Sequence, residues 1–329
     1  MPLRPWRALW GVLAIACLLP CGAAVAGAPG AAAPAAQPLK WPPPVLVNPV
    51  TVAIMPGDVN IHVPGARDCV LQWPRARHVG HVQISGCHNL VSIGGWNTIP
   101  DGPDHSNAPP SRILEISAIT GVAHVEGLLG DASGGGMSDC ITIAAPAAVV
   151  QIENVRCDGI FGFYDQFHAD CIQPFGGVKA LRIYDFTCRT GYQGLSIWPV
   201  GGSPLGWTAD LQRVNVISIG PAVYGGHNSG GYLYWPCATA QCANVGRTVL
   251  CDVYLQPRPA MAFSTTVYST VGGQIAHPAA LVAGAAPVIS FPGLPIDGHV
   301  TQGSPPAGDY VPVGAAGPDY VSPGYAPAS

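Results

Sequence analysis

The chain has 329 residues, of which 48% are hydrophobic and only 10% are charged, and it contains 42 glycines and 35 prolines. This mixture is typical of many short strands joined by tight corners, and it argues against a helical bundle. The net charge is −4, and Lys and Arg do not cluster beyond the extreme N-terminus, which excludes a basic surface for nucleic acid or an anionic membrane.

The N-terminus has the pattern of an export signal. Arg4 and Arg7 precede the apolar residues 8–19, and Ala24-Val25-Ala26 offers a small-residue cleavage site. We expect residues 1–26 to be a signal peptide, because the apolar run is too short to span a bilayer comfortably as an anchor. The mature protein is then secreted or periplasmic, with no membrane attachment after cleavage.

The rest of the chain divides by composition. Residues 27–45 are rich in Ala and Pro and predict a linker or an extended lead-in. Short apolar runs, separated by Gly, Pro, Asn or Asp, fill residues 46–257. Residues 258–302 predict further strands or a cap, and residues 303–329 predict an irregular tail. We expect one all-β domain between irregular Pro/Gly-rich ends.

One motif occurs twice in the centre of the chain, at a constant offset of 31 residues (139 to 170). Asp139-Cys140-Ile141 opens the first copy and Asp170-Cys171-Ile172 opens the second, while Cys157 and Cys188 close them. Apolar residues alternate within each copy with the period of a strand. Short strands that repeat at one offset predict a β-solenoid, a coil that stacks on itself. A two-sheet sandwich has no reason to repeat a local motif in register.

A second alignment extends the stack and predicts a binding surface. Residues 170–177 match residues 195–202, and the Trp-Pro pair of that pattern returns at Trp235. Indole faces pack on pyranose rings and amides bond hydroxyls, so we expect sugar binding along one outward column, unless the indoles cap corners or lie under a loop. The predicted column consists of Thr142, Gln173, Trp198 and Trp235.

These features resemble the right-handed parallel β-helix proteins of the pectin-lyase-like superfamily. Residues 82–95 and the two 31-residue copies look like turns of that fold, and the resemblance covers residues 46–257. It implies a right-handed parallel β-helix, but no single activity, because the superfamily includes lyases, hydrolases, esterases, phage tail proteins and adhesins.

The motifs of two well-defined families within that superfamily are missing. The adjacent aspartates, Gly-His-Gly and Arg-x-Lys of polygalacturonases are absent, and so is the acidic calcium-ligand set of pectate lyases. Neither pectin as a substrate nor a Ca²⁺ requirement is therefore supported, and we expect no cofactor. No cysteine pair has Cys-x-x-Cys spacing, so we expect no structural metal.

Candidate catalytic residues come from the densest polar cluster, residues 164–173, and from the corner that follows it. His168 and Asp170 lie two apart and would point to one side of a strand as a carboxylate–imidazole pair. A corner aspartate can instead accept backbone N–H bonds, which Asp139, the copy of Asp170, favours. His124 and Glu126 form another same-side pair, which we interpret as part of an ordinary outward polar face.

Two reactions fit these residues. A lyase needs a base, His168 or Tyr192, and a cation that stabilises the enolate. The candidate cations are Arg189, Lys179 and Arg182. A glycoside hydrolase needs two carboxyl groups, for which Asp165 and Asp170 are the nearest pair.

Of the 11 cysteines, nine follow the predicted signal peptide, which contains Cys17 and Cys21. Export favours their oxidation. Stacked cysteines such as Cys157 and Cys188 fall within disulfide distance of each other across adjacent turns. We therefore expect a bridge between turns, with a bridge inside one turn, such as Cys171–Cys188, or free stacked thiols as alternatives. Cys237 and Cys242 predict a small loop clip.

Three functions remain open from the sequence. The first is a secreted enzyme that acts on polysaccharide, a polysaccharide lyase or a glycoside hydrolase. The second is a non-catalytic glycan-binding or surface protein, which the sparse charge favours. The third is a structural protein that self-assembles through its end strands. We expect no nucleic-acid partner under any of these three functions.

Overall fold

The computed structural model describes residues 38–100, 111–197, 204, 206–237, 246–271, 274–275 and 286–325. Within these residues the chain is all-β, and its one helical element is a 3-10 turn at Phe263–Thr265. None of the helical structure in the described part is long and apolar enough to cross a membrane. The all-β class predicted from the composition is confirmed.

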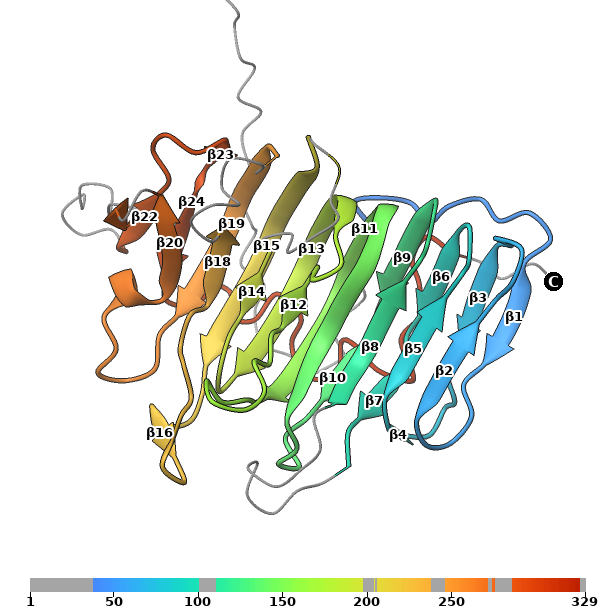
Figure 1. Cartoon of the computed structure of the whole chain (residues 1–329), viewed down its shortest axis with the longest axis horizontal. Helices are drawn as coiled ribbons and strands as arrows, with labels where there is room; N and C mark the ends of the chain where they lie inside the picture. The colour runs from blue at the N-terminus through green and yellow to red at the C-terminus, as the bar shows by residue number, and fades with distance from the viewer. Residues whose placement is uncertain are drawn as a thin grey trace, which may run out of the picture.

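Most strands belong to a long, mostly parallel array in which successive turns of the chain lie side by side (Figure 1). Two faces of this array are called sheet A and sheet B. Sheet B contains β2 (Val59–His62), β5 (Val82–Ser85), β8 (Ser111–Ser117), the first part of β11 (Ser138–Ile160), β12 (Ile172–Gln173), β14 (Leu195–Ser196), β18 (Tyr234–Cys237) and β20 (Val267–Val271).

Sheet A is longer, because it bends and continues on both sides of the bend. It contains β1 (Val50–Ala53), β3 (Cys69–Gln72), β4 (His78–Val79), β6 (Leu90–Ile93), β7 (Trp96–Thr98), β9 (Val122–Glu126), β10 (Leu129–Asp131), the rest of β11, β13 (Val178–Thr190), β15 (Thr208–Ser218), β19 (Thr248–Gln256), β23 (Ile296–Asp297) and β24 (His299–Gln302).

Among the described residues, three short antiparallel pairings accompany the array, and one of them forms a separate two-stranded sheet. β22 (Val288–Ser290) pairs with β24, β21 (Gln274–Ile275) pairs with β20, and β16 (Val223–Tyr224) forms a hairpin with β17 (His227–Asn228). Because β23 and β24 pair in parallel with β19, the stacking continues beyond the predicted boundary at residue 257.

The register confirms the 31-residue repeat. Ile141 lies beside Ile172 in sheet B, and Val150 beside Leu181 and Cys157 beside Cys188 in sheet A. Equivalent apolar residues thus form buried columns along the stack, such as Ile84, Ile116 and Ile143. Each such side chain contributes about 1.5–3 kcal/mol through burial. The arrangement is compatible with the predicted β-solenoid.

The bend of sheet A recurs at the same position in four turns. Asn154, Asp185, Arg213 and Asp252 have positive φ angles of 54°, 50°, 53° and 54°. Asn and Asp tolerate this left-handed conformation. The exception, Arg213, donates from Nε to the Asp185 carboxylate at 2.6 Å.

Two of the disulfides lie within one turn, so the expected bridge between the stacked Cys157 and Cys188 is wrong, whereas Cys69, in register with Leu90, bonds to Cys87 in the next turn. Cys140 pairs with Cys157, Cys171 with Cys188 and Cys69 with Cys87. The Cys140–Cys157 and Cys171–Cys188 bridges span the core between the two sheets, and the stacked cysteines lie in separate bridges. Cys251 is also disulfide-bonded. Cys242, half of the predicted clip, lies outside the described residues. Disulfides in this number indicate an oxidising compartment, extracellular or periplasmic.

Residues 303–325, here called the C-terminal strap, run back across the outer face of sheet A toward its first strands (Figure 1). Tyr310 N donates to Asn215 Oδ1 at 3.2 Å, and Val311 N to Thr187 Oγ1 at 3.0 Å. Farther along, Gly317 N donates to Gly127 O at 2.8 Å. The segment is irregular, as predicted, but it packs on the sheet instead of extending away as a free tail.

The strap corrects the interpretation of His124 and Glu126 as an outward polar pair. Both side chains are fully buried, with His124 Nε2 3.4 Å from Glu126 Oε2. The strap covers the end of β9, where a Cβ at Gly127 would collide with the Tyr320 ring. No local pattern in β9 reveals a segment almost 200 residues away (126 to 320) that removes it from solvent.

Candidate functional site

A polar hollow lies where the strands of sheet B begin, here called the start edge. A cavity of about 340 Å³ is bordered there by residues from three successive turns. Its described lining consists of Asp58, Asn60, His81, Pro100, Ser111, Arg112 and Phe167. Parallel stacking brings these residues together, because β2, β5 and β8 all begin at this edge.

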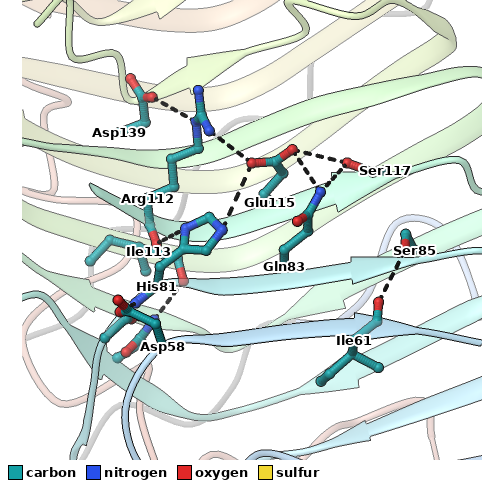
Figure 2. Close-up of polar contacts among 12 residues, drawn as sticks. Asp58, Ile61, His81, Gln83, Ser85, Arg112, Ile113, Glu115, Ser117 and Asp139 are labelled. Carbon is teal, nitrogen blue, oxygen red and sulfur yellow. Dashed lines mark hydrogen bonds and ion pairs between the residues drawn. The ribbon is translucent and has the colours of Figure 1, made fainter. Parts of the chain in front are cut away.

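Arg112 is the hub of the side-chain network beside this cavity. Figure 2 shows its guanidinium between two carboxylates: Nη1 lies 2.9 Å from Glu115 Oε2, and Nε lies 3.5 Å from Asp139 Oδ2. The guanidinium also lies over the Phe175 ring at 5.3 Å. These contacts fix a side chain that keeps 35% of its surface exposed.

Glu115 links this hub to the outward column of sheet B. Its Oε1 accepts hydrogen bonds from Gln83 Nε2 at 3.0 Å and from Ser117 Oγ at 3.1 Å (Figure 2). Asn60, Gln83 and Glu115 lie in register on β2, β5 and β8. The result is a ladder of amides and carboxylates on the outer face, which is suited to hydroxyl groups.

His81 and Asp58 form the opposite wall of the cavity. The backbone N–H of His81 donates to Asp58 Oδ1 at 2.7 Å, and His81 Nδ1 lies 3.2 Å from the carbonyl of Arg112. His81 Nε2 is 3.9 Å from Glu115 Oε2. Asp58 is exposed and lines the cavity.

Asp139 and Asp170 stack beneath this edge and share one buried environment. Asp139 Oδ1 accepts the Asp170 backbone N–H at 2.7 Å, while both Asp170 side-chain oxygens are buried without a hydrogen-bond partner. Burial raises the pKa of Asp139 to about 7. Burial and the nearby Asp139 charge raise the pKa of Asp170 well above its usual value. This burial supports the structural reading of Asp170 that the sequence left open.

The pair predicts an unusual dependence of stability on pH. The unfolded carboxyls lose their protons near pH 4, whereas the folded pair keeps protons to higher pH, so the free energy of unfolding falls as pH rises from about 4 to about 7. Asp170→Asn removes one titration, and we expect urea unfolding to show a pH-dependent loss at least about 1 kcal/mol smaller than in the wild type. Asp131→Asn, at the partly exposed end of β10, is the control. Equal pH slopes in D170N and the wild type would contradict this account.

The predicted catalytic residues do not converge on one point. His168 stacks between Tyr164 and Tyr192, with ring centroids 5.7 and 5.6 Å apart, and its Nε2 hydrogen-bonds the carbonyl of Tyr164 at 2.7 Å. Burial raises the pKa of Tyr192 above its usual range, which weakens its case as a base. Arg189 lies at the far end of β13, 4.0 Å from Asp158.

Asp165 has a partner that the sequence analysis did not identify. Its Oδ2 lies 2.8 Å from Nδ1 of His227, which belongs to β17, and this contact keeps the pKa of Asp165 below its usual value. Gln166 Nε2 lies 3.3 Å from His227 Nε2. Asp165 and His227 are 62 residues apart in the sequence, so no local spacing could have revealed this pair.

The predicted register of the column holds at one step, although Thr142 is fully buried and does not face outward. Thr142 lies beside Gln173, but Ser196, not Trp198, is in register with Trp235. The alignment was two residues out, because it matched the two Trp-Pro pairs while the strands align Leu195 with Tyr234. Trp235 is half-buried against Tyr232, and Trp198 lies outside the described residues.

The other binding candidates lie apart from the cavity. Lys179 is exposed near the start of β13, in sheet A, and Arg182 lies over the Trp41 ring at 5.8 Å. The polar residues of the cavity that sequence analysis missed include Asp58, Asn60, His81 and Arg112. Their common signal, a polar residue at or just before the start of each strand, becomes meaningful only once the stacking register is known.

Among the described residues, no group of three or more His, Cys, Asp and Glu side chains is arranged to hold a metal ion. Comparisons with protein-family models, with curated proteins and with solved structures find no match to this chain. A functional assignment therefore depends on the geometry and chemistry of the start edge itself.

Proposed function

We propose that this chain is an exported, right-handed parallel β-helix protein of the pectin-lyase-like type that binds polysaccharide at the start edge of sheet B. Three features support the architecture and the location: the parallel registers, the disulfides within turns and the N-terminal export pattern. The cavity bordered by Asp58, Asn60, His81, Arg112 and Phe167 carries the proposal for function.

The cavity combines the two kinds of contact that sugars require. Asn60, Ser111 and Asp58 provide hydrogen-bond donors and acceptors for hydroxyl groups. Phe167 provides a half-buried ring that can pack on the apolar face of a pyranose.

The loop that carries Phe167 enlarges this surface. Tyr164, three residues before Phe167, is 68% exposed and stacks on His168, which in turn packs on the buried Tyr192. This three-ring stack provides a rigid aromatic surface beside the cavity. We propose that it supports a second sugar unit of an extended chain.

A glycan array followed by calorimetry tests the proposal. Phe167→Ala should weaken binding of the retained glycan about tenfold or more, because ring packing on a sugar is lost. Asn60→Ala should weaken it about twofold to tenfold through one lost hydrogen bond. Gln72→Ala, an exposed amide on sheet A, is the matched control. Retention of no glycan, or equal affinities in F167A and Q72A, would refute binding at this edge.

Cleavage of the bound polysaccharide is the second candidate, and the Asp165–His227 contact favours it. The carboxylate accepts a hydrogen bond from Nδ1 of the imidazole, which leaves the Nε2 lone pair as the base once a substrate proton replaces the Gln166 amide that now lies 3.3 Å from it. A lyase or hydrolase with this base should lose about 100-fold or more in turnover on His227→Ala. Reducing ends and unsaturated products measure turnover, and unchanged glycan affinity in H227A separates catalysis from binding.

A further inference from the structure

The charges around the cavity are unevenly distributed. Arg112 is the only lysine or arginine among the described residues that line it, and two carboxylates already contact its guanidinium. Asp58 adds a negative charge with no cationic partner within ion-pair distance among the described residues. Asp165, in the loop beyond Phe167, adds another carboxylate, paired with His227.

The other described arginines with an ion pair belong to sheet A or its corners. Arg156 pairs with Asp158 and Asp309, Arg189 with Asp158, Arg213 with Asp185, and Arg247 with Asp297. None of these residues borders the cavity. An anion bound at the start edge would therefore find no arginine in the described lining that is free of carboxylate contacts.

We infer that the cavity selects neutral and amino sugars and discriminates against uronates, a conclusion that rests on the proposed glycan binding. A uronate carboxylate would be desolvated beside Asp58 while Arg112 remains engaged by Glu115 and Asp139. A sugar ammonium group would instead gain an attraction to Asp58, and hydroxyl and acetamido groups would use Asn60 and Ser111. The substrate class is thus unlike the polyuronates that a lyase cleaves by elimination.

Three hexasaccharides of equal length provide the test: oligomers of glucosamine, of N-acetylglucosamine and of galacturonic acid. Calorimetry with the full chain at low ionic strength should give dissociation constants for the first two that are at least about fivefold lower than for the third. Added salt should reduce the difference, because a partly exposed charge is screened.

Charge variants at position 58 assign the preference to the cavity. Asp58→Asn should remove the advantage of glucosamine over N-acetylglucosamine, while its side-chain oxygen can still accept the His81 N–H. Asp58→Lys should improve galacturonate binding about fivefold. Asp131→Asn and Asp131→Lys, at the end of β10 in sheet A, should leave the ranking unchanged, and thermal melting verifies that every variant is folded.

The outcomes separate the two proposals. If the galacturonate oligomer binds as tightly as the others, or if D58K leaves the ranking unchanged, the inference about charge is overturned while glycan binding stands. If none of the three oligomers nor any glycan of the array binds, the proposed function fails as well.

Discussion

Replacing Arg156 by Leu is expected to lower the free energy of unfolding by about 3 kcal/mol. The guanidinium is almost fully buried between the last part of β11 and the C-terminal strap. Its Nε lies 2.7 Å from Asp158 Oδ2, and its Nη1 lies 2.9 Å from Asp309 Oδ2 and 2.7 Å from the carbonyl of Val311. Leucine would remove this donor from two carboxylates and one carbonyl, and among the described residues only Asp309 would keep another, the Asn215 amide at 3.0 Å.

Arg247→Leu is the matched control for this prediction. Arg247 lies 2.7 Å from Asp297, but the two side chains are 73% and 60% exposed, so the loss should be below about 1 kcal/mol. Urea unfolding of both variants measures the difference. Hydrogen exchange should also show faster exchange in the strap of R156L. Equal stability losses in the two variants would show that the strap is not fastened by Arg156.

Removal of one disulfide has the second large expected effect. The double substitution of Cys171 and Cys188 by Ala should lower the free energy of unfolding by about 3 kcal/mol, because the unfolded chain regains the freedom of a 17-residue separation. Both cysteines are fully buried, so any cavity left by the lost sulfurs adds to this loss.

The same substitution at Cys69 and Cys87 tests the physical cause. This bridge spans 18 residues, nearly the same separation, but lies close to the first strands of the stack. If chain entropy dominates, calorimetric unfolding should give losses within about 1 kcal/mol of each other. A loss below about 1 kcal/mol for the Cys171–Cys188 bridge would contradict its proposed role in holding the two sheets together.

The part of the fold that repeats locally could be predicted from the sequence. The constant offset between the two motif copies predicted the neighbours of Ile141 and Cys157 correctly, because turns of equal length must stack in register. The prediction failed where loop lengths change. The strand around Leu195 aligns with Tyr234, and the resemblance between two Trp-Pro pairs misplaced it by two residues.

The disulfide pattern carried a signal that was not used. Both motif copies place their two cysteines 17 residues apart, and Cys69 and Cys87 are 18 apart. A cysteine spacing that recurs in both motif copies indicates that the two cysteines of each copy pair with each other. A bridge between the stacked Cys157 and Cys188 also falls within disulfide distance, so geometry alone did not distinguish it from a bridge within one turn.

The rest of the site depends on contacts between distant segments. Burial of His124 and Glu126 requires the C-terminal strap, and the contact of Asp165 with His227 requires two loops to meet. The cavity likewise needs the register of three turns before Asp58, His81 and Arg112 become neighbours. A sequence reports such contacts only through patterns within each segment, and these segments contain none.

A crystal structure of the protein with a bound hexasaccharide of N-acetylglucosamine would test the central claim most directly. We predict electron density for at least one sugar ring in the cavity, with its apolar face on Phe167 and its hydroxyl groups within hydrogen-bond distance of Asp58 or Asn60. Density for the oligosaccharide on sheet A instead, with the start edge of sheet B empty, would contradict the account.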